Sequence, residues 1–368
     1  MKKPLGIYVH IPFCVKKCGY CDFCSVTDFS LIKKYVSRMC DDIVSAGEKY
    51  GDNYFVDTVY FGGGTPTCAG EGLCDILSAI KTAFKLEDNA EISFEANPAT
   101  ADVKLLSKLR SSGFNRMSVG IQSANENELR RLGRIHSFED AVRLVAEGRA
   151  AGFKDIGGDL MLGIPEQTKE SMIRSVCSLA ALGMEHISAY MLKIEPNTPF
   201  GDNVPSELPD EDETAEIYLA AVELMRDLGY RRYEISNFSK PGFECRHNMK
   251  YWSLGDYLGF GPTAHSCFEG RRTSVEGSVA EYCEGKAVMK DRGPCGGIDE
   301  YIMLALRTEA GIDNAFIKER YGKTFCTNTV TDALLRKGLI SIGDRISLTD
   351  DGVLLSNGII SELMECYE

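Results

Sequence analysis

Residues 7–21 read IYVHIPFCVKKCGYC and place three cysteines directly after a β-rich run. Cys14, Cys18 and Cys21 follow a C-x3-C-x2-C spacing, so their thiolates can hold three irons of one cluster from a single compact loop. Soft sulfur ligands suit iron–sulfur clusters. The spacing therefore predicts a [4Fe–4S] cluster whose fourth iron has no cysteine ligand. S-adenosylmethionine (SAM) can fill that open position through its amino and carboxylate groups.

Two other sites are compatible with these cysteines. A structural zinc site normally takes a second, closely spaced pair of cysteines further along the chain, and no such pair follows. Alternatively, Cys24 comes three residues after Cys21 and can supply a fourth thiolate. That ligand would close the cluster and make it an electron-transfer centre.

The composition is that of a globular chain. Of 368 residues, 44% are hydrophobic and 26% are charged, which suits one large α/β domain with a smaller appendage. The net charge of -13 disfavours binding to nucleic-acid phosphates. We expect neither a signal peptide nor a membrane span, because no suitable apolar stretch occurs. We therefore expect a cytoplasmic protein, and its 14 cysteines do not read as a disulfide framework, because that compartment keeps thiols reduced.

Short β-rich runs alternate with amphipathic stretches over the first 230 residues. The expected strands are residues 6–11, 58–61, 91–95, 116–120, 155–160 and 187–192. The expected helices are residues 31–46, 72–84, 101–111, 138–151, 169–182 and 210–228. These β-then-α units predict an α/β fold with a parallel sheet and helices outside it. An open doubly wound sheet and a barrel both fit the pattern.

The alternation defines a core domain over residues 1–230 and ends there. Residues 231–296 are rich in glycine and aromatic residues and indicate a structured connector over one face. Residues 297–368 predict helices at 300–307, 314–321 and 330–337, then a hairpin at 339–342 and 346–348. This order is typical of a winged-helix-like domain. The acidic composition favours a packing or lid role over nucleic-acid binding.

Residues 7–13, IYVHIPF, and residues 20–23, YCDF, resemble the oxygen-independent coproporphyrinogen III oxidase family of radical SAM proteins. Within that family the sequence is most similar to the heme chaperone (HemW-type) branch. The resemblance runs from Tyr8 to about Arg307. It implies a partial, open (β/α)6 radical SAM barrel with a small C-terminal helical, winged-helix-like domain. It also implies that three cysteines bind iron and that Cys24 does not.

A glycine-rich motif, FGGGTPT at residues 61–67, follows the second expected strand. Successive glycines let the backbone approach a ligand closely. The motif resembles the turn that cradles the methionyl part of SAM in radical SAM proteins, which assigns Gly63, Gly64 and Thr65 to SAM. Further polar residues stand at later strand ends, which meet on one face of a barrel.

The resemblance extends to single SAM contacts. In the oxidase branch, one SAM is contacted by residues that match Tyr8, Tyr20, Gly63 and Glu95. A second SAM is contacted there by residues that match Gln122, Arg134 and Asp159. Lys193 stands where that branch carries a small residue near SAM, so its side chain is expected to narrow the space for a second molecule.

His247 lies beside the only tryptophan, Trp252, in ECRHNMKYW at residues 244–252. An imidazole among flat aromatic rings can ligate heme iron while the rings cover the porphyrin. The run H-N-x-x-Y-W resembles the heme-chaperone signature, which implies heme at His247, Tyr251 and Trp252, with Cys245 as the alternative axial ligand. Without the family, packing of the connector against the barrel is the simpler interpretation.

The resemblance implies a heme chaperone that binds heme and transfers it to an acceptor apoprotein. A [4Fe–4S] cluster, exchangeable SAM and a reductant such as flavodoxin or ferredoxin would support it, and a homodimer is compatible. The alternatives are an oxygen-independent coproporphyrinogen III oxidase of porphyrin biosynthesis and a heme-degrading radical SAM methyltransferase. Phe23 disfavours the oxidase, because that branch has cysteine there, and so do the mere thirteen residues before Cys14. Whether the protein is an enzyme stays open.

Overall fold

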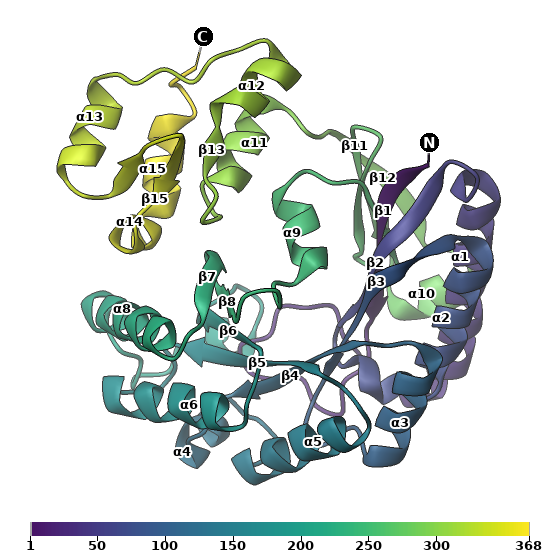
Figure 1. Ribbon diagram of the computed structural model, residues 1–368. Coiled ribbons are helices and arrows are strands. Elements are labelled where there is room, and N and C mark those ends of the chain that lie inside the picture. Colours follow the sequence, from purple (N-terminus) through teal and green to yellow (C-terminus); the bar gives the residue numbers. More distant parts are fainter. Residues whose placement is uncertain (1, 368) are drawn as a thin grey trace.

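The computed structural model describes residues 2–367. A twelve-stranded sheet forms its centre, and six parallel strands of that sheet curve into an incomplete barrel (Figure 1). These strands are β1 (Lys3–Ile11), β2 (Tyr54–Gly63), β3 (Lys85–Ala96), β4 (Arg116–Gln122), β5 (Asp155–Leu162) and β6 (His186–Met191). The outer helices are α1 (Ile32–Tyr50), α2 (Gly72–Ala83), α3 (Val103–Ser112), α5 (Phe138–Ala150), α6 (Lys169–Ala181) and α8 (Glu211–Asp227). The partial, open (β/α)6 barrel expected from the sequence is therefore confirmed.

Strand β1 shows how alternate residues serve two faces of the barrel wall. Ile7 and Val9 are fully buried in the main hydrophobic core. Tyr8 and His10 point the other way, and the Tyr8 ring stacks on Tyr60 of β2 at 6.4 Å between ring centres. Side chains of a strand alternate between its two faces, so the core residues hold the wall and the intervening ones face the interior.

Several outer helices begin at capping boxes that are visible in the sequence. Ser137 and Asp140 cap α5 reciprocally, and Asp210 and Glu213 do the same for α8. Each box satisfies backbone N–H groups that have no partner within the helix. Such caps stabilise a helix by about 1 kcal/mol each and define where it starts.

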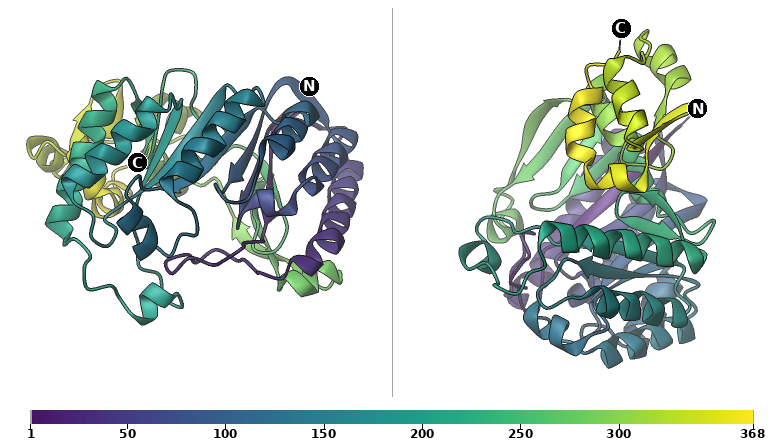
Figure 2. Two further views of the ribbon diagram at one scale, coloured as in Figure 1. Left: turned by 90° about the horizontal axis from the view of Figure 1, so that it is seen from below. Right: turned by 90° about the vertical axis from the view of Figure 1, so that its left-hand side faces the viewer.

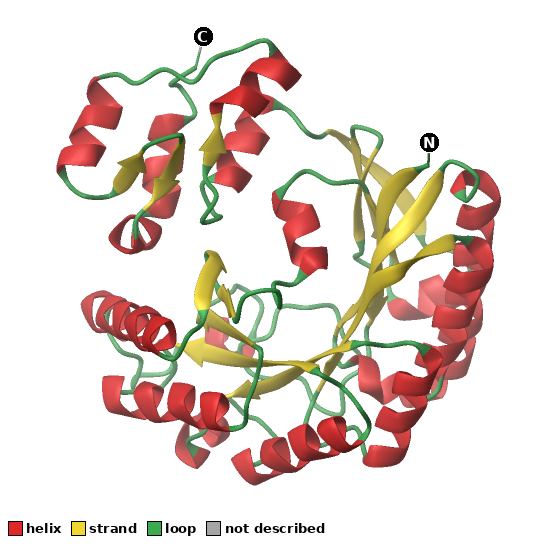
Figure 3. Ribbon diagram, in the orientation of Figure 1, coloured by secondary structure: helices red, strands yellow, loops and turns green. Residues whose placement is uncertain are grey.

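Residues 231–296 do more than connect two domains, because they extend the sheet at both edges. On one side lie β7 (Arg231–Glu234) and β8 (Asn237–Ser239), next to β6. On the other side lie β9 (Tyr257–Phe260), β10 (His265–Phe268), β11 (Arg271–Glu276) and β12 (Val288–Pro294), next to β1, with α10 (Val279–Cys283) before β12. Between the two groups, α9 (Arg246–Trp252) lies inside the curve of the sheet (Figure 3). The sequence pattern did not predict these pairings, because the strands are short and their partners are far away in the chain.

The C-terminal residues form a small mixed unit. Its helices are α11 (Ile298–Ala305), α12 (Asn314–Tyr321), α13 (Thr329–Arg336), α14 (Asp350–Leu354) and α15 (Ser356–Leu363). Its three-stranded sheet has the order β13 (Ile312–Asp313), β15 (Arg345–Leu348), β14 (Ile340–Ile342). The unit packs beside α8 (Figure 2), where Asp350 accepts a hydrogen bond from Arg226 and forms an ion pair with Arg232.

One continuous hydrophobic core runs from Leu5 in β1 to Cys366 near the C-terminus. The domain limits at residues 230 and 296 therefore stay a prediction. Within residues 2–367, we find no helix with the length and apolar character needed to cross a membrane.

Candidate functional site

The cysteine loop follows β1 and lies at the carboxyl ends of the barrel strands. Cys14, Cys18 and Cys21 all line one cavity of about 510 Å³. No group of three His, Cys, Asp or Glu side chains in residues 2–367 meets the geometry of a single-ion site. A [4Fe–4S] cubane does not require that geometry, because each thiolate binds a different iron and the three sulfurs need only surround one space. The three cysteines fit a [4Fe–4S] cluster on this ground.

Cys24 lies apart from these three thiols. It does not line the cavity and packs against the hydrophobic core instead. The His10 Nε2 atom lies 3.1 Å from the Cys24 carbonyl oxygen, and the His10 Nδ1 atom lies 3.0 Å from the Tyr8 hydroxyl. A carbonyl only accepts, so His10 donates from Nε2 and Nδ1 accepts from Tyr8. The backbone at Cys24 is thereby tied to β1, whereas its neighbours Asp22, Phe23 and Ser25 line the cavity.

The glycine turn after β2 fits tightly against the cysteine loop. The Gly64 amide donates to the Ile11 carbonyl at 2.9 Å, and the Thr65 amide donates to the Phe13 carbonyl at 2.8 Å. A side chain at Gly64 would come within 3.0 Å of the Cys14 sulfur. Gly63 has a φ of 113°, which non-glycine residues rarely adopt. Both glycines are thus required by the close approach of the two loops.

The interior wall of the cavity carries two enclosed carboxyl groups. Glu95 at the end of β3 accepts a hydrogen bond from the Tyr60 hydroxyl at 2.9 Å. Asp159 in β5 accepts one from the Ser118 hydroxyl at 3.1 Å. Burial, together with the nearby charge of Asp159, raises the pKa of Glu95 to about 8. Positive charge beside them would favour the ionised form of both carboxyls, so the pair suits a cationic ligand such as SAM, which has sulfonium and ammonium groups.

Arg134 supplies the opposite charge on the other side of the cavity. Its Nη2 donates to the Gly120 carbonyl at 2.9 Å, and its Nη1 lies 3.4 Å from the Cys18 sulfur. A guanidinium beside a cluster ligand suits the carboxylate of SAM. The cavity therefore offers complementary groups for the cationic and anionic parts of this molecule.

Most residues that the sequence assigned to SAM meet at this cavity. Its lining includes Tyr20, Gly63, Gly64, Thr65, Glu95, Gln122, Arg134 and Asp159. Tyr8 is not part of the lining, and its ring stacks on that of Tyr60, which is. Lys193 lies at the edge, where its side chain is 79% exposed and pairs with Glu195 at 2.5 Å. Lys193 belongs to the cavity lining, and the narrowing we expected there stays a prediction.

Sequence reasoning missed Tyr60, Ser118, Ser188 and Tyr190, which also line the cavity. Each belongs to one of the parallel strands β2, β4 and β6. Ser188 and Tyr190 are two residues apart, as expected for side chains on one face of a strand. The signal that would have found these residues is therefore the two-residue period within strands already predicted.

We expect the titration of Glu95 to lower stability as the pH rises. Its pKa is about 8 in the folded protein against 4.5 ordinarily, so the folded state holds its proton more tightly. Stability is fully present below pH 4.5 and falls between 4.5 and about 8, by at most roughly 1.4 kcal/mol per pH unit. Chemical denaturation of the SAM-free protein at several pH values measures this slope. Glu95→Gln should flatten it, whereas the exposed Glu48→Gln should not; equal slopes in all three proteins would contradict the assignment.

The predicted heme residues gather on and around α9. His247 is fully buried, with Nδ1 at 2.9 Å from the Thr58 hydroxyl and Nε2 at 2.7 Å from the Tyr251 hydroxyl. Its ring also stacks on Tyr60. Burial, and secondarily the charge of Lys250, lowers the pKa of His247 to about 3, so the ring is neutral.

Neither nitrogen of His247 is therefore open to an iron atom in this arrangement. Cys245, the alternative ligand, is 1% exposed, and its sulfur lies 3.6 Å from Glu91. Trp252 is partly exposed at the end of α9. Heme does not fit at His247 or Cys245 as they stand, and ligation by either stays a prediction that requires these contacts to break.

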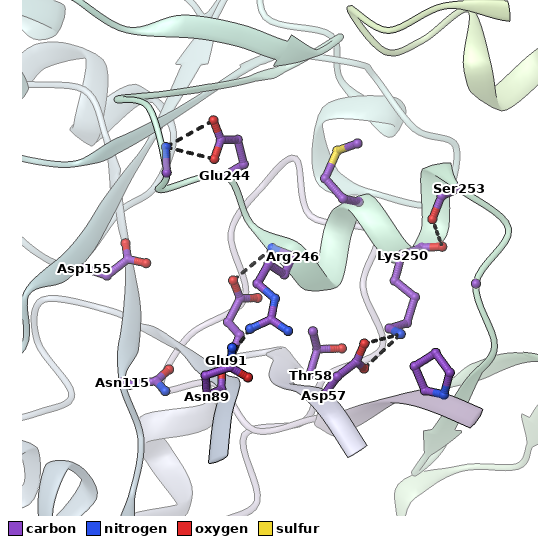
Figure 4. A pocket seen from close by; sticks show the side chains of 14 residues that line it. Asp57, Thr58, Asn89, Glu91, Asn115, Asp155, Glu244, Arg246, Lys250 and Ser253 are labelled. Carbon is purple, nitrogen blue, oxygen red and sulfur yellow. Dashed lines mark hydrogen bonds and ion pairs between the residues drawn. The ribbon is translucent and has the colours of Figure 1, made fainter. Parts of the chain in front are cut away.

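Helix α9 is held from below by charged residues, as Figure 4 shows. Glu91 accepts from the backbone amides of Arg246 and His247 at 2.9 and 3.0 Å, and Lys250 pairs with Asp57 at 2.9 Å. Asp57, Glu91, Arg246 and Lys250 line a second cavity of about 660 Å³ at the amino-terminal side of the barrel strands. Residue Asn248 of α9 lines the cavity at the cysteine loop. Helix α9 thus lies between the two cavities.

Comparison with known proteins identifies the family. The sequence profile of the Radical SAM superfamily matches residues 8–176. The heme chaperone HemW of Haemophilus influenzae is 38% identical over 384 residues, which cover 99% of this chain and 98% of that protein. The heme chaperone HemW of Bacillus subtilis is 33% identical, with coverage of 97% and 98%.

A solved structure shows the same fold. The coproporphyrinogen III oxidase of Escherichia coli, described as a radical SAM enzyme, superposes with a TM-score of 0.83 at 22% identity and covers 99% of this chain and 91% of its own. At that identity the similarity concerns the fold alone. The full-length sequence matches reach further and confirm the resemblance found in the sequence: the chain belongs to the radical SAM superfamily and, within it, to the family of the heme chaperone HemW.

Proposed function

We propose that this protein binds heme and transfers it to an acceptor apoprotein. The observation that carries the proposal is the similarity, along nearly the whole chain, to proteins named heme chaperone HemW in several bacteria. The proposal includes a [4Fe–4S] cluster on Cys14, Cys18 and Cys21 and SAM in the same cavity. Bound there, the cluster would supply one-electron reducing power beside the sulfonium.

Within this proposal, particular residues of the protein have defined roles in binding SAM. Arg134 holds the SAM carboxylate, and Glu95 and Asp159 attract its positive groups. Gly63 and Gly64 keep the backbone close enough to contact the methionyl part. A small electron donor such as flavodoxin or ferredoxin serves as the reductant, the cytoplasm is the compartment, and a homodimer is the proposed assembly.

The decisive experiment incubates the anaerobically reconstituted protein with heme and, separately, with coproporphyrinogen III. We expect a stoichiometric heme complex, seen by absorbance, and no protoporphyrinogen. Transfer is then followed as the loss of heme from the protein on addition of a heme-accepting apoprotein. Decarboxylation of coproporphyrinogen with matching consumption of SAM would replace the chaperone with the oxidase.

A further inference from the structure

A third cavity lies outside the barrel, between α1 and the antiparallel strands β9 to β12. It measures about 490 Å³, within the range of about 300–1,000 Å³ typical of small-molecule sites. One wall is a strip of α1 that includes Ser45, Ala46 and Tyr50. The other wall is the inner face of the strands, and Tyr282 of α10 closes one end. We call this cavity the lateral slot.

The lateral slot exists because two neighbouring faces of α1 carry side chains of different size. Met39 and Ile43 are fully buried in the core of the barrel. The neighbouring strip carries the small residues Ser45 and Ala46, which cannot fill the space toward the strands. The added strands therefore curve over α1 and leave an open gap.

The walls of the slot are apolar and aromatic. Leu258, Phe268 and Val275 contribute from three successive strands. The Phe268 ring meets the Tyr50 ring edge to face, with 4.8 Å between ring centres. This ring contact closes one part of the slot, and the branched aliphatic side chains of Leu258 and Val275 line the rest, which suits a flat apolar ligand.

Two arginines stand on opposite walls of this apolar space. Arg38 of α1 pairs with Asp42 at 2.7 Å, and its Nε is buried with no partner among the described residues. Arg271 of β11 is about half exposed and pairs with Asp291. Guanidinium groups bind carboxylates through two parallel hydrogen bonds. The slot therefore suits a flat apolar molecule with carboxylates at its edge.

Met289 adds a group with affinity for iron. It lines the slot from the edge strand β12, and its side chain is 67% exposed. A thioether serves as an axial heme ligand in cytochromes c. An exposed thioether beside an apolar slot is thus available to an iron porphyrin without any rearrangement of the fold.

The other two cavities suit this ligand less well. The cavity at the cysteine loop contains the three cysteines and two enclosed carboxyls, which favour a cation. The cavity below α9 carries more acidic than basic side chains: Asp57, Glu91, Asp155 and Glu244 against Arg246 and Lys250. Carboxylates at that position would repel the propionates of a porphyrin. The lateral slot carries equal numbers of acidic and basic side chains, Asp42 and Glu269 against Arg38 and Arg271.

We propose that the lateral slot is the heme-binding site, with Arg38 and Arg271 as propionate partners and Met289 as an iron ligand. This assignment rests on the proposed function and places heme on the outer side of α1, away from the cysteine cavity. The site opens at the edge of the sheet, where an acceptor protein can reach it. His247 then stabilises α9 and does not ligate the iron.

The test compares two tryptophan substitutions on the same helix. Ala46→Trp fills the slot, whereas Val44→Trp is the matched control on an exposed part of α1 outside the slot lining. Ferric heme is titrated into the reconstituted full-length proteins and followed by absorbance. We expect at least a tenfold weaker affinity for Ala46→Trp and no change for Val44→Trp. Iron and sulfide content and circular dichroism establish that both variants fold.

Two exposed positions keep the test valid if Ala46→Trp does not fold. Arg271→Ala should weaken heme binding several-fold, whereas Arg231→Ala, at the exposed first residue of β7, should not. Met289→Leu should change the heme spectrum while His247→Asn leaves it unchanged.

If wild type binds heme and Ala46→Trp and Arg271→Ala bind it equally well, the slot assignment falls and the chaperone function stands. If wild type binds no heme, both fall. Two other findings at unchanged heme affinity also overturn the assignment. Binding of oleate that Ala46→Trp abolishes would make the slot a lipid site, and an altered sedimentation coefficient in Ala46→Trp would assign it to a second copy of the chain.

Discussion

Cys18→Ala is expected to abolish the cluster, with iron and sulfide after anaerobic reconstitution falling to background. Cys14, Cys18 and Cys21 line one cavity, and no other cysteine lines it, so none can replace a lost thiolate there. A cubane held by only two thiolates is too weakly ligated to persist. The same loss is expected for Cys14→Ala and Cys21→Ala. The measurement is iron and sulfide per chain, with the cluster absorbance and the EPR signal of the reduced protein.

Two cysteines serve as controls for this prediction. Cys24→Ala should keep full iron and sulfide, because Cys24 packs against the core and does not reach the cavity. The exposed Cys177 reports any general effect of removing a thiol. Equal loss of iron in Cys24→Ala and Cys18→Ala would reverse the assignment and indicate a closed, four-cysteine cluster.

His247→Ala is expected to lower the free energy of unfolding by about 3 kcal/mol. The imidazole is fully buried, and its removal leaves a cavity beside Tyr60. It also leaves the hydroxyls of Thr58 and Tyr251 without their partner. Denaturant unfolding followed by circular dichroism measures the loss.

His265→Ala is the matched control, because this histidine is exposed on β10. It should change the unfolding free energy by less than about 0.5 kcal/mol. A His247→Ala protein as stable as wild type, with its heme spectrum altered, would show instead that His247 ligates heme. That outcome would require α9 to open on binding.

Local features of the sequence were sufficient for much of the site. Cys14, Cys18 and Cys21 fall within eight consecutive residues, so that a single loop can carry all three. The glycine turn at Gly63 and Gly64 is also readable, because residues without Cβ are needed where two loops approach closely. The alternation of strands and helices also predicted the parallel core. Each strand and each helix has its own spacing of apolar residues, which can be read without knowing the tertiary contacts.

The tertiary structure alone decided which polar residues are open to a ligand. His247 reads as a heme ligand in its motif, yet its Nδ1 atom meets Thr58, which lies 189 residues earlier in the chain. Tyr8 was assigned to SAM, yet Tyr60 of the neighbouring strand lines the cavity and Tyr8 does not. The lateral slot arises only where α1 meets strands more than 200 residues later. A sequence pattern encodes which face of an element is apolar, whereas burial and hydrogen-bond partners depend on which distant elements cover that face.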